Sequence, residues 1–163
     1  MVPLSGLDIC QYNILLLGAV GAGKSSFINT LSTVFTGKVE PIAQFRQSVS
    51  SVTTKLKKYD LRSANDDTLK LRIFDIRGFE SKRENDKELE LLIDGRIPEN
   101  YQFPDTVNPD DIKERPNPTF NDKIHLICFV EGNSDYEKLS TDLKERLLRI
   151  NQVICNTGYM LHE

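Results

Sequence analysis

The stretch Leu15–Phe27, "LLLGAVGAGKSSF", decides the fold, because it joins an apolar run to a glycine-rich turn and a helix-forming segment. Its spacing G-x-x-x-x-G-K-S is that of a phosphate-binding loop between a strand and a helix. Glycines let such a loop fold around an oxyanion, while backbone N–H groups and the helix N-terminus point at the phosphates. Lys24 would add a cation at the β- and γ-oxygens, and the Ser25 hydroxyl would ligate Mg²⁺.

The flanking segments supply the strand and the helix that this loop needs. Tyr12–Leu17 is continuously apolar from Ile14 onward, which predicts a strand covered on both faces of a parallel sheet. The helix is predicted from apolar residues at helical spacing, with Gly37 as its stop signal: Phe27, Ile28, Leu31, Val34 and Phe35. The residues predicted to contact phosphate are Gly18, Ala19, Val20, Gly21, Ala22, Gly23, Lys24, Ser25 and Ser26, the last as a helix-start residue rather than a second metal ligand.

The next part of the chain predicts a loop followed by a hairpin. Residues Lys38–Thr54 are rich in Ser, Gln and Thr without a clear period, so they are interpreted as a loop. Lys55–Leu61 alternates as an outer strand does, and turn residues separate it from a second strand at Leu69–Ile76. We therefore expect an antiparallel pair.

The second half of the chain predicts a helix, a long connection, a strand and a helix. A short helix containing Leu89–Ile93 should end near Gly95, and five of the seven prolines then fall within Pro98–Pro118. Lys123–Gly132 shows a buried-strand pattern, and Lys138–Cys155 has one apolar face at helical spacing. This order predicts an α/β fold of the P-loop NTPase, G-domain-like type, with a mostly parallel sheet and one antiparallel edge strand.

A metal-side carboxylate and a γ-phosphate contact are predicted from "FDIRG". Asp75 ends an apolar strand expected to lie beside the first, where it would hold Mg²⁺ through a water, and Gly78 can offer its N–H to the γ-phosphate. In "SSVTTKL", either Thr53 or Thr54 could coordinate Mg²⁺ when the γ-phosphate is present. The competing interpretations are a plain turn at the strand end and threonines placed for strand propensity.

Hydrolysis has weaker support in the sequence. Phe79 follows D-x-x-G, where many GTPases have a glutamine that orients the attacking water, so intrinsic turnover should be slow. Four cations could supply charge in the transition state, but each is better explained as a solvated surface residue: Arg46, Arg77, Lys82 and Arg83. His125 is interpreted as a hydrogen-bonded core residue rather than a catalytic base.

Composition narrows the function classes. The 163 residues carry a net charge of −3, with a sequence pI near 5.5, which does not favour nucleic acid as a partner. Three widely spaced cysteines indicate neither a disulfide framework nor a zinc site. The chain shows no apolar run long enough to span a bilayer and no signal-peptide pattern, so we expect a cytoplasmic protein.

The combined segments resemble a known family. The phosphate loop with its flanks, then "SVTTK", "FDIRGF", "IPENYQF" and "KIHLICFV", is similar to the GTPase-like domain of the interferon-induced protein 44 family. The resemblance covers about Gly6 to Gly158. It implies a cytoplasmic, interferon-inducible protein of innate antiviral defence that binds GTP or GDP with Mg²⁺. It also implies Lys24 and Ser25 at the phosphates and Mg²⁺, Asp75 at the metal, and Thr53 as the switch threonine.

The chain departs from that family at its end. The T/N-K-x-D motif that reads guanine is not present in residues 1–163, so we expect one GTPase-like domain without the base-recognition part. The strand at Lys123–Val130 should then have an unpaired edge, which favours a homodimer or another protein partner. Two other functions stay open: a non-hydrolysing interaction module in immune signalling, and an ATP-dependent P-loop enzyme.

Overall fold

The computed structural model describes residues 10–18, 21–43, 56–76, 86–98, 101, 112–131 and 141–156. Strands and helices follow each other in the order expected from the sequence, with a short 3₁₀ turn, η2, inserted before the last strand. The elements are β1 (Tyr12–Leu17), α1 (Lys24–Thr36), β2 (Lys57–Arg62), β3 (Thr68–Asp75), α2 (Asp86–Ile93), η2 (Phe120–Asp122), β4 (Leu126–Phe129) and α3 (Thr141–Asn156).

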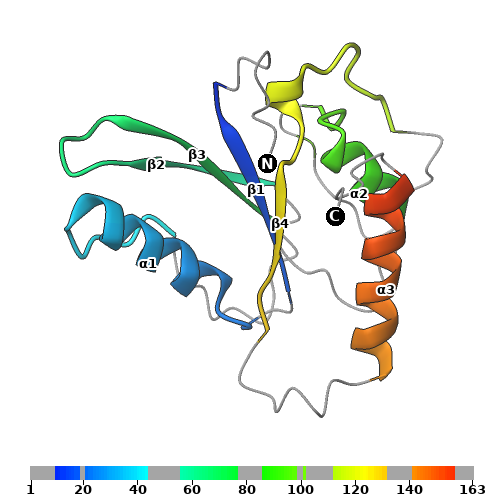
Figure 1. Cartoon of the computed structure of the whole chain (residues 1–163), viewed down its shortest axis with the longest axis horizontal. Helices are drawn as coiled ribbons and strands as arrows, with labels where there is room; N and C mark the ends of the chain where they lie inside the picture. The colour runs from blue at the N-terminus through cyan, green and yellow to red at the C-terminus, as the bar shows by residue number, and fades with distance from the viewer. Residues whose placement is uncertain are drawn as a thin grey trace, which may run out of the picture.

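The described strands form one sheet in the order β2-β3-β1-β4 (Figure 1). β1 pairs in parallel with both β3 and β4, and β2 pairs antiparallel with β3. The predicted hairpin and the single antiparallel edge strand are therefore confirmed. Because β1 lies between two parallel neighbours, its carboxyl end and the phosphate loop after it lie in the middle of the sheet edge.

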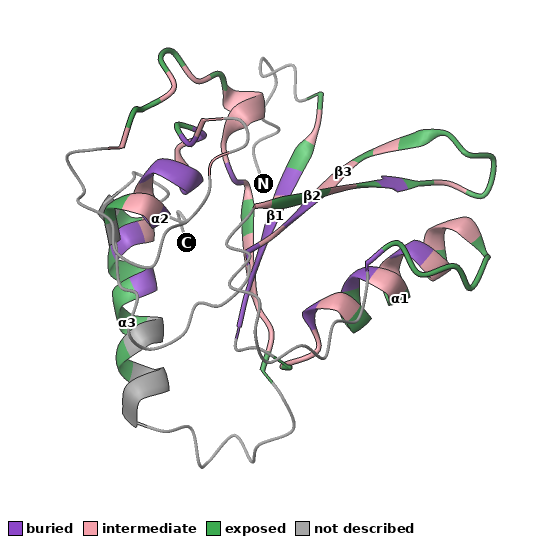
Figure 2. Ribbon diagram, turned by 180° about the vertical axis from the view of Figure 1, so that it is seen from behind, coloured by how far each residue is buried: buried purple, intermediate pink, exposed green. Residues whose placement is uncertain are grey.

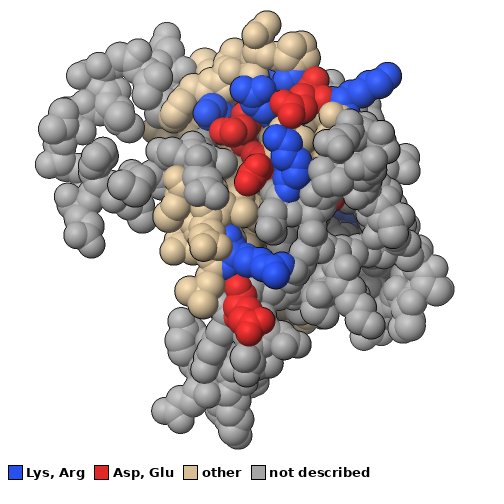
Figure 3. Space-filling model, turned by 90° about the vertical axis from the view of Figure 1, so that its right-hand side faces the viewer, with Lys and Arg blue, Asp and Glu red and all other residues tan. Residues whose placement is uncertain are grey.

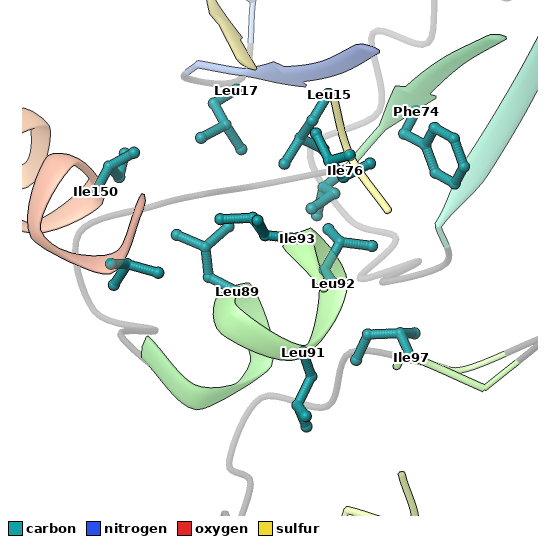
Figure 4. Packing of buried hydrophobic residues seen from close by; sticks show 12 residues of the cluster. Leu15, Leu17, Phe74, Ile76, Leu89, Leu91, Leu92, Ile93, Ile97 and Ile150 are labelled. Atoms are coloured by element: carbon teal, nitrogen blue, oxygen red, sulfur yellow. The ribbon is translucent and has the colours of Figure 1, made fainter. Parts of the chain in front are cut away.

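Helices cover both faces of the sheet, with α1 on one side and α2 and α3 on the other (Figure 1). Successive residues of β1 point to opposite faces, so Leu16 packs in the cluster under α1 while Leu15 and Leu17 pack under α2 and α3. All three are at most 1% exposed. Figure 4 shows the second cluster, in which Leu89 and Ile93 of α2 face β1. Burial on both faces explains why β1 is apolar without alternation.

Helix α1 packs on the sheet through only part of its predicted apolar set, since Ile28, Leu31 and Phe35 belong to the cluster under α1. Lys24, Ile28 and Ser32 are its buried residues, which are four positions apart and therefore lie on one face. Phe27 and Val34, which belonged to the predicted apolar set, are 39% and 70% exposed, as the mixed colours of α1 in Figure 2 reflect. The helix ends as predicted, because Gly37 adopts a left-handed conformation and donates its N–H to the Thr33 carbonyl.

Strand β4 corrects the prediction of a buried strand over Lys123–Gly132. It spans only Leu126–Phe129, none of its residues is buried, and Leu126 is 52% exposed. The reason is its position, since among the described residues β4 is the last strand and pairs only with β1. The apolar residues just outside it carry more of the packing, with Ile124 2% exposed and bonded through its N–H to the Ile93 carbonyl.

The segment after α2 is held close to the helix and to η2. Gly95 ends α2 with a φ of +70°, and a side chain there would lie 2.5 Å from the Asp122 carbonyl oxygen, so this position requires glycine. The Tyr101 hydroxyl donates a 2.5 Å hydrogen bond to Glu88 of α2. Burial and this carboxylate raise the pKa of Tyr101 above its ordinary value, so it remains a neutral donor.

Charged side chains on the face that Figure 3 shows are interleaved by sign. Three ion pairs connect α2 and the turn after it with the segment 113–123, namely Lys87–Glu114, Arg96–Glu114 and Lys123–Asp94. Each partner is partly exposed, so each pair contributes at most about 1 kcal/mol.

The three cysteines, Cys10, Cys128 and Cys155, are free thiols. No helix within the described ranges combines the length and apolarity needed to cross a membrane.

Candidate nucleotide site

The phosphate loop leaves β1 and enters α1 at the carboxyl edge of the sheet. Gly21 and Gly23 adopt φ values of +82° and +103°, which strain any residue with a side chain. No atom lies within 4 Å of the position a Cβ would take at either glycine, so both border open space. Ala19 and Val20 lie outside the described residues. Backbone conformation and space here are those of an anion-binding loop.

Gly18 is required for a different reason, which the sequence motif does not reveal. A Cβ at Gly18 would lie 2.0 Å from the Val130 carbonyl oxygen. The chain leaving β4 passes directly over this glycine, because the Val130 N–H donates a 2.7 Å hydrogen bond to the Leu17 carbonyl. The first glycine of the motif therefore serves the packing of β4 against β1.

Lys24 places a buried cation at the loop. Its side chain is 8% exposed, and its ammonium donates a 2.6 Å hydrogen bond to the Gly18 carbonyl, so the side chain folds back over the loop. Burial lowers the pKa of Lys24 from its ordinary value, and the negative charge of Asp75 partly offsets that effect. A second negative group beside this ammonium would be electrostatically favourable.

Asp75 lies where the sequence predicts it, at the end of the strand next to β1. It is the last residue of β3 and is in register with Leu16, two residues before Gly18. Its Oδ1 atom is buried, and its charge acts on both Lys24 and Tyr59, raising the pKa of the latter together with burial. The strand-end carboxylate thus lies close enough to the loop for its charge to act on Lys24.

The first turn of α1 is open to an anion. Its N-cap, Gly23, has no side chain to bond the first N–H groups, and the first turn contains no acidic residue. Ser25 is half-buried and Ser26 exposed in this turn. The other predicted contacts, Thr53 and Gly78, lie outside the described residues, as do Arg46, Arg77, Phe79, Lys82 and Arg83.

This donor set fits a magnesium polyphosphate. Mg²⁺ prefers oxygen ligands and is commonly held by one or two side chains together with phosphate oxygens. The Ser25 hydroxyl and the Asp75 carboxylate are such oxygen donors. Over the described part of the chain, no group of three His, Cys, Asp or Glu side chains forms a metal site without phosphate. A bound Mg²⁺ would here neutralise charge on the β- and γ-oxygens.

Comparison with known proteins identifies the family. The family model described as Septin matches residues 8–144, which run from before β1 into α3. The chain belongs to the septin family. Its fold is accordingly that of a septin-type P-loop NTPase, as the loop and the sheet order indicate. No solved structure gives a significant match.

Curated relatives of this septin-family chain are interferon-induced proteins. Interferon-induced protein 44 of Pan troglodytes is 31% identical over 162 residues, and that of Homo sapiens is 30% identical over the same length. Both alignments include 94% of this chain and 36% of the relative. Interferon-induced protein 44-like of Homo sapiens is 24% identical over 156 residues. The chain therefore spans about a third of the length of the relatives it matches, and the predicted resemblance is confirmed.

Hydrogen bonds between helix α1 and the segment after it were not predicted from the sequence of this septin-family chain. The Asn29 side chain donates to the Ala43 carbonyl at 2.9 Å and accepts from the Ala43 N–H at 2.8 Å. Ala43 is fully buried in the cluster under α1. The segment after α1 is thus fixed to the helix at this residue. Only the presence of a polar residue in a helix could have signalled the contact, and that signal is not specific.

His125 makes hydrogen bonds as predicted, although it is half-buried rather than part of the buried core. Its Nδ1 accepts the Asn13 backbone N–H at 2.8 Å, while the backbone N–H of His125 donates to the Asn13 carbonyl at 2.8 Å. The ring lies against Phe120, with 4.8 Å between ring centroids. Burial lowers the pKa of His125, although a backbone contact at Phe120 opposes this effect. A proton on Nδ1 would break the bond to Asn13.

We expect the protein to lose stability as the pH falls below the ordinary histidine pKa of about 6.5. Because the folded pKa of His125 is lower than the unfolded pKa, the unfolded chain binds more protons in this range. Urea unfolding at about pH 7 and about pH 5 measures the effect. His125→Asn keeps an acceptor near Nδ1 without titrating and should flatten the dependence. His162→Gln removes the other histidine and should leave the pH dependence unchanged. If the free energy of unfolding depends equally on pH in all three proteins, the role of His125 is contradicted.

Proposed function

We propose that this chain is a guanine-nucleotide-binding domain that holds Mg²⁺ with GTP or GDP between the phosphate loop and Asp75. The observation that carries this proposal is the buried ammonium of Lys24, which lies on the Gly18 carbonyl beside the charge of Asp75 and next to the open space at Gly21 and Gly23. A buried cation is costly unless anions compensate it. A polyphosphate would supply that charge in addition to Asp75.

The loop residues would act through known kinds of contact. The N–H groups from Gly18 through Ser26 would bind phosphate oxygens, Lys24 would replace its bond to the Gly18 carbonyl by bonds to the β- and γ-oxygens, and the Ser25 hydroxyl would ligate Mg²⁺. We assign Thr53 to the same metal and the Gly78 N–H to the γ-phosphate. With both contacts dependent on that phosphate, the domain would act as a switch.

The biological setting follows from the relatives. Membership of the septin family and the G-domain layout support guanine over adenine. The relatives' names support an interferon-induced protein. As part of the proposal, we assign it to innate antiviral defence and to the cytoplasm. We take residues 1–163 as one domain. The exposed edge of β4, with Leu126 at 52% exposure, is the surface through which we expect self-association.

Slow hydrolysis, or none, is part of the proposal. Phe79 follows the D-x-x-G motif and cannot hydrogen-bond to water, so it cannot orient an attacking water molecule. Binding without turnover would make the domain a nucleotide-dependent interaction module, whereas rapid phosphate release would contradict the slow-turnover part of the proposal.

Calorimetric titration with GTP, GDP and ATP, with and without Mg²⁺, tests this function. We expect guanine nucleotides to bind more tightly than ATP and Mg²⁺ to strengthen GTP binding. Asp75→Asn keeps the shape of the side chain but removes its charge, so it should abolish at least a 10-fold Mg²⁺ enhancement, about 1.4 kcal/mol. Phosphate release and the mass in solution, measured on the same samples, test turnover and self-association.

Asp67→Asn is the matched control for this titration, because Asp67 is an exposed aspartate in the turn between β2 and β3. It should bind as the parent does. A preference for ATP would sink the guanine assignment. An undiminished Mg²⁺ effect in Asp75→Asn would show that the carboxylate does not serve the metal.

A further inference from the structure

A cavity of about 580 Å³ lies on the α2 side of the sheet, away from the phosphate loop. Its lining includes Lys58 of β2, Arg72 and Phe74 of β3, and Ile97 and Arg115 from the segments after α2 and before η2. None of the described loop residues Gly18 and Gly21–Ser26 lines it. Its volume is within the usual range for ligand pockets, about 300–1,000 Å³.

The cavity presents hydrogen-bond donors on positively charged side chains. Arg72 donates to both carboxylate oxygens of Asp60, at 2.6 and 3.3 Å, and Gln11 adds a third bond, so this acid is already satisfied. Arg115 likewise binds Asp122, whose second oxygen accepts two bonds from Thr119. The carboxylates of Asp60 and Asp122 are therefore already hydrogen-bonded within the chain.

Among the cations of the lining, Lys58 has the most hydrogen-bond donors left for a ligand. Its ammonium lies 5.6 Å from the centre of the Phe74 ring, and its side chain is exposed. An ammonium has three donors, and a ring face is a weak acceptor. A carboxylate entering the cavity would find this group and the guanidinium of Arg115, which also lines it.

The remaining lining is mixed, with apolar side chains beside the polar residues Asn13, Tyr101, Asn121 and Asp122. Leu56, Leu92 and Ile97 contribute aliphatic surface beside Phe74. Asn13, which is 1% exposed, donates from its side-chain nitrogen to the carbonyls of Asn121 and Lys123, and its Oδ1 has no hydrogen-bond partner among the described residues. Because Oδ1 is itself buried, it is not open to a ligand in the cavity.

We propose that this cavity binds an acidic peptide segment of a partner protein. The carboxylate would bind Lys58 and Arg115, and an adjacent apolar side chain would pack on Phe74 and Ile97. An inorganic anion would leave the apolar lining uncovered, and a fatty acid would leave the polar lining unpaired. A peptide combines an acidic and an apolar side chain with a polar backbone in one chain.

A random dodecapeptide phage library, panned on the full chain without nucleotide, tests the proposal. Enriched sequences should combine Asp or Glu with a neighbouring apolar residue. Calorimetry with a synthetic enriched peptide should give at least about a 10-fold weaker Kd for Lys58→Glu, because the attraction becomes repulsion. Lys70→Glu makes the same charge change on an exposed residue of β3 outside the cavity lining and should bind normally.

Three results would overturn the proposal. One is enrichment of peptides without acidic residues, and another is equal binding by the parent and Lys58→Glu. The third is displacement of the peptide by millimolar acetate alone, which would identify a site for small anions. Since Lys58 is exposed, Lys58→Glu should fold, and an unchanged circular dichroism spectrum confirms that it does. Nucleotide titrations on the same variant separate this proposal from the nucleotide site, because Lys58→Glu should bind GTP normally.

Discussion

Gly18→Ala is expected to lower the free energy of unfolding by about 3 kcal/mol or more. The new Cβ would lie 2.0 Å from the Val130 carbonyl oxygen, and the φ of +145° is one that residues with side chains rarely adopt. Relief requires the chain after β4 to move away, which would break the bond between the Val130 N–H and the Leu17 carbonyl. Urea unfolding followed by circular dichroism measures the loss.

Gly21→Ala is the matched control for this prediction. Its φ is also positive, at +82°, but nothing lies within 4 Å of the new Cβ. The cost should be only the conformational strain of about 1–2 kcal/mol. If the two variants lose the same stability, the packing role of Gly18 is wrong and its conformation alone explains the glycine.

Lys24→Met should weaken binding of GTP by about 10- to 100-fold, because hydrogen bonds to charged groups contribute about 1.5–3 kcal/mol. Without nucleotide the same variant should be as stable as the parent or more so. Burial already disfavours the ammonium, as the direction of its pKa shows, and a methionine fills a similar volume without that cost. Calorimetry and urea unfolding on the same samples measure the two effects.

This pairing of results separates a binding lysine from a structural one. Lys70→Met, at an exposed position of β3, should change neither quantity. A loss of stability in Lys24→Met with unchanged nucleotide affinity would mean that the ammonium serves only to bond the Gly18 carbonyl. The phosphate loop would then not be the nucleotide site.

Local sequence patterns were sufficient to predict the elements but not their faces. The strand at Tyr12–Leu17 and the stop at Gly37 are as predicted, because an apolar run and a left-handed glycine act over a few residues. Phe27 and Val34 were predicted on the apolar face of α1 but are exposed, because the face that α1 buries depends on where the sheet lies. The predicted strand at Lys123–Gly132 was too long because apolar composition does not show which strand is last in a sheet.

Some features of the candidate site could likewise be predicted from the sequence, and others could not. Lys24, Ser25 and Asp75 could be proposed from spacing alone, and β1 and β3 do bring the loop and the carboxylate together. Three features needed the fold: the crossing of Val130 over Gly18, the anchor between Asn29 and Ala43, and the cavity containing Lys58.

The amino-acid sequence by itself determined the phosphate loop, the order of strands and helices, and the family, because each depends on residues that are close together along the chain. Only the tertiary structure decided which residues those elements bring into contact. The bond between Asn13 and His125 joins residues 112 positions apart, and no local pattern specifies such a pair. Long-range contacts depend on the packing of the whole sheet, so the reason for Gly18 and the chemistry of the second cavity emerged only from the fold.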